Sequence, residues 1–190
     1  QLSILIDILP FYLTPKQCIK YYSSNNFLYK IYLKNNKFEN NYFMPKTNYE
    51  LQIAVNEWCI NKKEAIIKYG YINNWNTIYI TYMAYLFKDK KDFNDDISDW
   101  NTSNVNDIIC MFYNTEKFNK DISNWNTSNI IDMSSMFAYS TNFNQNLNKW
   151  NIKNVKCINC IFYNNKNFDK LNCKDWNLNH ISNDNKLYMF

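Results

Sequence analysis

The sequence of 190 residues predicts an α+β repeat solenoid, in which each coil holds a short strand and a short helix, preceded by an α-helical region. The first observation is a 25-residue step, with a last step of 26, between the residues Trp75, Trp100, Trp125, Trp150 and Trp176. The same step separates Phe93, Phe118, Phe143 and Phe168. A fixed period of roughly 20–50 residues is typical of stacked repeats. Large aromatic residues that recur in this way are expected to be structural, each sealing one coil against the next.

One repeat, residues 118–142, shows the structure that we expect of every coil. Its segment 121–123 sets one apolar residue between two polar ones, which predicts a short strand. Segment 127–129 offers hydroxyl and amide side chains that can cap a helix at its N-terminus. Apolar residues then follow at helical spacing, namely Ile130, Met133, Met136 and Phe137. Each coil is therefore predicted to be a strand, a polar turn and a short helix.

The polar residues of the coils predict a recognition surface. Side chains that flank the inward residue of a strand face outward, because side chains alternate along a strand. This predicts one polar recognition face made of Asp96, Ser98, Asp121, Ser123, Asn146 and Asn148. Paired strands lie about 4.8 Å apart. An amide ladder is therefore expected along the asparagines that follow the tryptophans, namely Asn76, Asn101, Asn126, Asn151 and Asn177.

The chain divides into three expected regions. Residues 1–45 predict short helices, because apolar residues recur there at helical spacing. Residues 46–70 predict a helical N-terminal cap that covers the apolar face of the first coil. Residues 71–190 hold about four repeats, and the last unit is degenerate.

The cap region carries start and stop signals for helices. Thr47 and Glu50 have the spacing of a capping box, in which both side chains bind free N–H groups of the first turn. Gly70 is the single glycine of the chain and follows a helical run. A glycine in that place predicts a left-handed C-cap.

The repeats resemble the BspA-like leucine-rich repeat family, and within it the 25-residue branch with the motif FNxDISxWxTSNVxxMxxMF. The matching segments are FNDDISDWNTSNVNDIICMF at 93–112, FNKDISNWNTSNIIDMSSMF at 118–137 and FNQNLNKWNIKNVKCINCIF at 143–162. The resemblance covers about residues 70–181. It implies leucine-rich-repeat-like coils used for recognition or adhesion, and it implies no chemistry.

A second resemblance concerns ILIDILPFYLTPKQCIKYYSSNNFLYKI near the N-terminus, which is similar to an F-box. The Tyr12-Leu13 step and Thr14-Pro15-Lys16 match the middle of that motif, whereas its usual leading Leu-Pro is missing. An F-box docks a Skp-type adaptor of a cullin–RING ubiquitin ligase. The resemblance implies that the adaptor would contact Leu9, Leu13, Pro15 and Ile19.

Composition argues against several other functions. The net charge is +4, and the chain contains no arginine, so we expect no nucleic-acid binding. The single histidine, His180, lies in the degenerate last unit without an evident nucleophile, so no enzymatic activity and no catalytic residue are expected. Cys157 and Cys160 form a C-x-x-C, but they replace other residues of the repeat, so no metal and no cofactor are expected. No apolar run is long enough to span a membrane.

These observations predict a monomeric, non-enzymatic protein–protein interaction module that acts inside the cell, as a substrate receptor of a cullin–RING ubiquitin ligase if the F-box-like segment is genuine. The alternative is an extracellular surface protein or adhesin of the BspA-like lipoprotein type. Under both hypotheses the ligand is a protein whose identity the sequence does not give.

Overall fold

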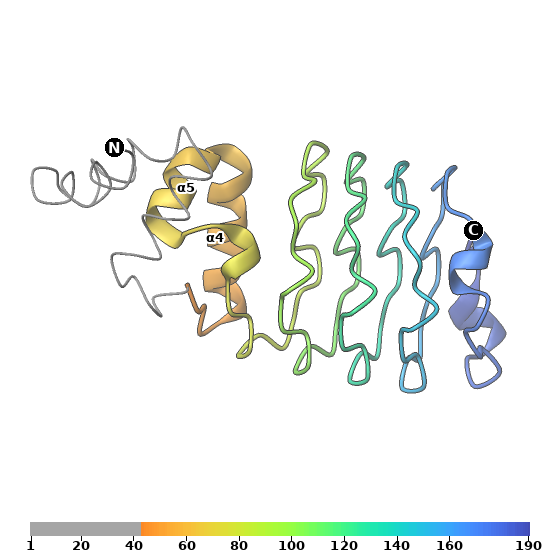
Figure 1. Cartoon of the computed structure of the whole chain (residues 1–190). Helices are drawn as coiled ribbons and strands as arrows, with labels where there is room; N and C mark the ends of the chain where they lie inside the picture. The colour runs from red at the N-terminus through yellow and green to blue at the C-terminus, as the bar shows by residue number, and fades with distance from the viewer. Residues whose placement is uncertain (1–42) are drawn as a thin grey trace, which may run out of the picture.

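The computed structural model describes residues 43–190. Two helices stand at the N-terminal end of a row of narrow coils that lie side by side (Figure 1). The helical elements are α4 (Asn48–Ile60), α5 (Lys62–Tyr69) and the short 3-10 helices η2 (Ile72–Asn74), η3 (Lys170–Cys173) and η4 (Asn183–Lys186). The F-box-like segment with Leu9, Leu13, Pro15 and Ile19 lies outside the described residues.

The two α-helices begin and end where their capping residues stand. The Thr47 hydroxyl accepts a hydrogen bond from the Glu50 N–H at 3.1 Å, and the Glu50 carboxylate accepts one from the Lys46 N–H at 2.6 Å. Asn61 ends α4 and caps α5. Gly70 follows α5 with φ +74°, a region that L side chains rarely adopt, but its ψ of −171° differs from the predicted left-handed helical cap.

The predicted leucine-rich-repeat-like α+β solenoid is wrong. Within residues 43–190 there is no sheet, and β-type pairing is confined to isolated parallel bridges between coils, at Tyr82–Asp107, Asp107–Asp132 and Asp132–Cys157. The expected strand at 121–123 is irregular and leads into a turn, and the expected helix after Ile130 is a succession of tight turns.

The segment predicted to be helical makes hydrogen bonds to the next coil instead of within itself. The N–H groups of Met133, Ser135, Phe137 and Tyr139 donate to the carbonyl groups of Cys157, Asn159, Ile161 and Tyr163, at 2.8–3.0 Å. The N–H groups of Met136 and Ala138 donate to the carbonyl three residues earlier. Backbone donors therefore alternate between the neighbouring coil and a local turn, which satisfies the backbone without a helix or a strand.

Positive φ angles curl this segment at two fixed positions. The first column is Tyr85, Cys110, Ser135 and Cys160, and the second is Asp89, Asn114, Tyr139 and Asn164, with φ between 51° and 63°. Such angles interrupt any regular helix or strand. Turns of this kind also bring residues three and four apart to the same side, as a helix does. The apolar spacing therefore predicts the buried residues but not the backbone conformation.

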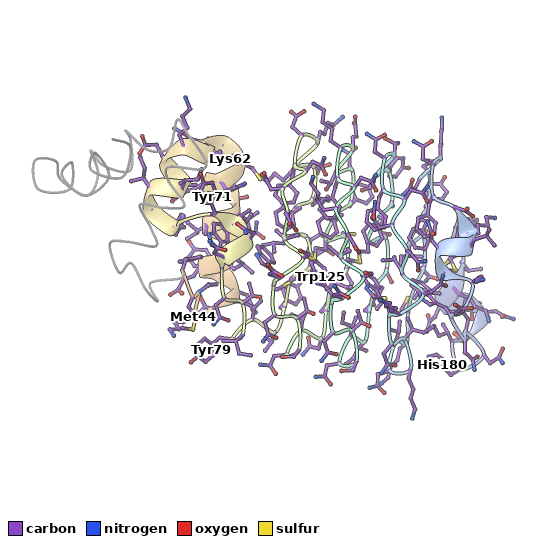
Figure 2. The ribbon with its side chains drawn as sticks, viewed as in Figure 1. Met44, Lys62, Tyr71, Tyr79, Trp125 and His180 are labelled. Atoms are coloured by element: carbon purple, nitrogen blue, oxygen red, sulfur yellow. The ribbon has the colours of Figure 1, made fainter. Side chains whose placement is uncertain are left out.

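The core is built from stacked aromatic columns. Ring centroids of Phe112 and Phe137 lie 5.6 Å apart with parallel planes, and those of Phe118 and Phe143 lie 5.8 Å apart. The tryptophans form a third column, which includes Trp75–Trp100 at 6.1 Å, Trp125–Trp150 at 6.5 Å and Trp150–Trp176 at 6.3 Å. Figure 2 shows Trp125 near the middle of the row. The five tryptophans of the repeats are all buried, as are Phe93, Phe118, Phe143 and Phe168.

The helix pair joins this core through its inward residues. Leu51, Ala54, Val55 and Trp58 of α4 are buried, and the Trp58 ring meets that of Trp75 edge-on at 5.7 Å. The apolar side of the first coil is thereby removed from water.

The expected amide ladder is wrong in its position. The Oδ1 atoms of Asn76, Asn101, Asn126, Asn151 and Asn177 accept hydrogen bonds from the N–H two residues later in their own turn. Asparagine side chains favour such local turns. Ladders form in two other columns instead. Asn119 Oδ1 accepts from the Asn144 N–H at 3.0 Å, and Asn129 Nδ2 donates to the Ser103 carbonyl at 2.6 Å.

Candidate binding surface

Two of the surfaces that the coils present to solvent differ in their side chains. The backbone of residues 82–89, 107–114, 132–139 and 157–164 forms hydrogen bonds between neighbouring coils, and we call the outward side chains of these segments the ladder face. The second face consists of the outward side chains of residues 94–99, 119–124, 144–149 and 169–175. In each coil a buried phenylalanine of the first segment packs on the phenylalanine that directly precedes the second segment, as Phe112 does on Phe118 at 4.1 Å. Side chains that point away from this shared core therefore form separate surfaces.

The predicted recognition residues lie on the second face. Asp96, Asp121 and Asn146 are exposed, whereas Ser98, Ser123 and Asn148 are half-buried. In each pair the Oδ1 atom of the first residue accepts a hydrogen bond from the N–H of the second, at 2.9–3.0 Å. These side chains shape their own turns. Their use in recognition stays a prediction.

Hydrogen bonds and lysines favour the ionised form of two carboxylates of that face, Asp96 and Asp121. The backbone N–H and the side chain of Ser98 lower the pKa of Asp96, and the positive charge of Lys120 lowers it further. Ser123 lowers the pKa of Asp121 in the same way, with a contribution from Lys149. The carboxylates of Asp96 and Asp121 thus have basic neighbours.

The ladder face carries exposed aromatic side chains that sequence reasoning did not single out. Tyr82, Tyr85, Tyr139 and Tyr163 are 41%, 46%, 37% and 37% exposed, and Tyr113 is half-buried. We call these five residues the tyrosine row. Tyr113 and Tyr163 share a position of the repeat and the other three do not, so no single 25-residue column reveals the row. Within the described part of the chain, the second face has one comparably exposed large apolar side chain, Leu171.

The rings of the tyrosine row contact one another across coils. The centroids of Tyr113 and Tyr139 lie 5.3 Å apart, and those of Tyr139 and Tyr163 lie 5.7 Å apart, both edge to face. The Lys88 ammonium lies 5.7 Å from the ring centre of Tyr85 and 5.4 Å from that of Tyr113. These distances are suitable for cation–π attraction.

Two carboxylates lie beside the tyrosine row. Asp107 and Asp132 are half-buried, form a parallel bridge and accept hydrogen bonds through Oδ1 from the N–H groups of Ile109 and Ser134. Burial raises the pKa of Asp107, and the neighbouring charge of Asp132 raises it further against the lowering effect of the Ile109 N–H. Neither carboxylate takes part in the four ion pairs formed among residues 43–190.

Comparison with known protein families shows to which family the chain belongs. The family described as "Mycoplasma protein of unknown function, DUF285" matches residues 57–137 and 107–190. The two matches together span well over half of the chain. The chain belongs to the DUF285 family. Searches of curated proteins and of solved structures found no match.

Residues 43–190 of this DUF285 protein hold five cysteines, none of them in a disulfide. Cys59, Cys110, Cys157, Cys160 and Cys173 are free thiols. Burial raises the pKa of Cys59 and of Cys173 to about 11, so both are protonated thiols at neutral pH. Across residues 43–190 no three of the His, Cys, Asp and Glu side chains gather as metal ligands would.

A pocket of about 680 Å³ opens where α4 meets the first coil. Its walls include Trp58, Ile60 and residues 89–95. The indole N–H of Trp58 donates to the Asp95 carboxylate at 2.8 Å, and Lys62 forms an ion pair with the same group. Asp95 is therefore held by its own chain and serves the junction between helix and coil.

His180, which the sequence analysis considered for chemistry, lies apart from this pocket. Figure 2 shows His180 at the opposite end of the row from Lys62, which lines the pocket. His180 Nε2 lies 3.1 Å and 3.0 Å from the carbonyl oxygens of Ile152 and Val155.

Of the helices in residues 43–190, none has the length and apolar character to cross a membrane.

Proposed function

We propose that this DUF285 protein is a non-enzymatic protein-binding module and that it binds its ligand through the ladder face. The observation that carries this proposal is the tyrosine row, an exposed aromatic strip that crosses four coils. Serine and asparagine side chains accompany it, among them Ser135, Asn114 and Asn164. Tyrosine, serine and asparagine together are typical of protein-binding surfaces, because tyrosine gives a large amphipathic contact area at low entropic cost.

The hydrogen bonds of the ladder favour recognition by side chains. Alternate N–H groups of each coil already donate to the next coil, as Ser135 does to Asn159. A ligand therefore gains little by adding a strand along this surface. Exposed rings that contact one another are pre-ordered, which lowers the entropic cost of binding.

We further propose that the repeats share their origin with the BspA-like repeats, whose motif FNxDISxWxTSNVxxMxxMF matches residues 118–137 closely. This relationship favours an adhesin at the cell surface.

The intracellular alternative, a substrate receptor of a ubiquitin ligase, depends on the F-box-like segment. Loss of Skp-type adaptor binding in a Leu9→Asp/Ile19→Asp variant of the full chain would support that alternative, whereas no adaptor binding by the unmodified chain at tens of micromolar would exclude it.

The binding surface is tested by capturing ligands from extracts of the source organism with three forms of the full chain. The ladder-face form carries Tyr113→Ser, Tyr139→Ser and Tyr163→Ser. The matched control carries Asp99→Ser, Asn124→Ser and Lys149→Ser, which are exposed residues of one column on the second face. We expect the tyrosine variant to lose the captured protein and the control to retain it. Retention by the tyrosine variant, with loss by the control, would move the site to the second face.

A further inference from the structure

The charges of the ladder face indicate what kind of partner it fits. Its outward charged residues are Asp89, Asp107, Asp132 and Lys88, so the face has a formal charge of −2 although the whole chain carries +4. Lys88 is engaged with Tyr85 and Tyr113. The four segments of the second face carry the same formal charge of −2, so the two faces differ in how their carboxylates are paired and not in their net charge.

The pair Asp107 and Asp132 lacks the compensation found on the second face. There, Lys120 and Lys149 act on Asp96 and Asp121 and favour their ionised forms. Asp121 also raises the pKa of Asp96, but Lys120 acts against it. Asp132, by contrast, is the charged neighbour that acts on the pKa of Asp107, one coil away and in register. Two stacked carboxylates repel each other, and a positive charge placed between them would remove this repulsion.

The aromatic rings around this pair are suited to the same kind of charge. Tyr82 lies close enough to Asp107 and Tyr85 for their charges to act on its pKa, after the larger effect of burial. The position of Lys88 over two rings of the row shows that these ring faces accept an ammonium group. Carboxylates combined with exposed tyrosine faces bind lysine and arginine side chains by charge and by cation–π attraction.

We propose that the ladder face docks a basic segment of its protein partner, with lysine or arginine side chains held between the Asp107–Asp132 pair and the tyrosine row. The proposal rests on the proposed function and adds the chemistry of the ligand. Opposite charges across an interface raise the rate of association and make binding sensitive to salt.

A titration of the full chain with a defined probe tests this proposal. The probe is a short fluorescein-labelled peptide of alternating arginine and serine, followed by fluorescence anisotropy at low and at high salt. Because the protein is positive overall, unspecific attraction of this peptide is disfavoured. We expect binding that weakens with salt, and a loss of affinity of about five- to tenfold in Asp107→Asn/Asp132→Asn, the effect of one or two ion pairs.

The matched control is Asp96→Asn/Asp121→Asn, which changes two aspartates of the same turn type, also one coil apart, on the second face. Asparagine keeps the Oδ1 acceptor in all four positions, and thermal melting verifies that each variant is folded. We expect the control to bind the peptide like the unmodified chain. No binding by the unmodified chain, or equal affinities of the two double variants, would overturn the proposal.

The two proposals fail in different ways. If the tyrosine variant loses its captured protein while Asp107→Asn/Asp132→Asn binds both that protein and the peptide normally, the face is the binding site and its ligand is not basic. If the tyrosine variant keeps its captured protein, the proposed function itself fails.

Discussion

The indole N–H of Trp125 donates to the backbone carbonyl of Ile97, 28 residues earlier, at 3.2 Å. Trp100, Trp150 and Trp176 repeat this bond to Ile72, Ile122 and Leu147 at 2.8–3.1 Å. Each of these tryptophans thus ties its coil to the preceding one, in addition to the area that it buries. The column acts as a structural seam and is too buried to be a ligand groove.

Replacing a tryptophan of this column by alanine should destabilise the protein most in the middle of the row. Trp125→Ala is expected to lower the free energy of unfolding by about 3–5 kcal/mol, as for other large buried aromatic residues. The defect weakens two coil interfaces at once. Trp176→Ala should lower the free energy of unfolding less, because Trp176 has a neighbouring tryptophan on one side. Thermal and urea melts of both variants measure this, and equal, negligible shifts would contradict a structural role.

Trp125→Phe separates the hydrogen bond from the packing. The Ile97 carbonyl also accepts the Trp100 N–H at 3.2 Å, so it keeps one partner in the variant. The expected loss is therefore about 1–2 kcal/mol, for one hydrogen bond and a smaller ring. A loss as large as that of Trp125→Ala would show that the indole bond dominates.

Asn165 offers a stabilising substitution. In the two preceding coils, Thr115 and Ser140 occupy the same column, and their hydroxyls donate to the carbonyls of Phe87 and Phe112. Asn165 is buried, donates to Phe143 instead, and its Oδ1 has no hydrogen-bond partner. Asn165→Thr should continue the hydroxyl column toward Phe137 and raise stability by about 1 kcal/mol. Asn165→Ala, which cannot form this bond, is the control in urea unfolding, and equal effects would contradict the explanation.

The positive φ columns predict an unusual preference at an exposed site. Asn164 is exposed and has φ +56°. Because a β-branched residue is strained there, Asn164→Gly should be more stable than Asn164→Val by about 1–2 kcal/mol. Lys166 is also exposed but is not among the positive-φ residues, so its glycine and valine variants should not favour glycine. Chemical unfolding of the four variants decides, and the same order at both sites would contradict the assigned backbone.

Sequence periodicity predicts which residues are buried but not how the backbone runs. Phe137 and Met133 are 0% exposed, as their spacing implies. The same spacing suits a helix and a run of tight turns, and the choice between them depends on partners such as Asn159 in the next coil. The tyrosine row could not be predicted because its five members are spread over four columns of the repeat.

The two faces should respond to pH in opposite directions. The pKa of Asp107 is raised in the fold, so its contribution to stability is present at low pH and is lost as pH rises through its folded pKa. Asp107→Asn should therefore raise the melting temperature at pH 7, and the gain should vanish near pH 3. The pKa of Asp96 is lowered, so Asp96→Asn should lower the melting temperature at pH 7, with the difference again vanishing in acid. Melting curves between pH 3 and pH 7 measure both, and shifts of the same sign would contradict the assignment.

The ladder that creates the proposed binding face is tested most directly by scalar couplings across hydrogen bonds, measured by NMR on the deuterated, isotope-labelled chain. The structure predicts a coupling from the Ser135 amide nitrogen to the Asn159 carbonyl carbon and one from Phe137 to Ile161. A helix over the same residues would couple Ser135 to Ile131 and Phe137 to Met133. Couplings to Asn159 and Ile161 support the account, and couplings to Ile131 and Met133 would contradict it.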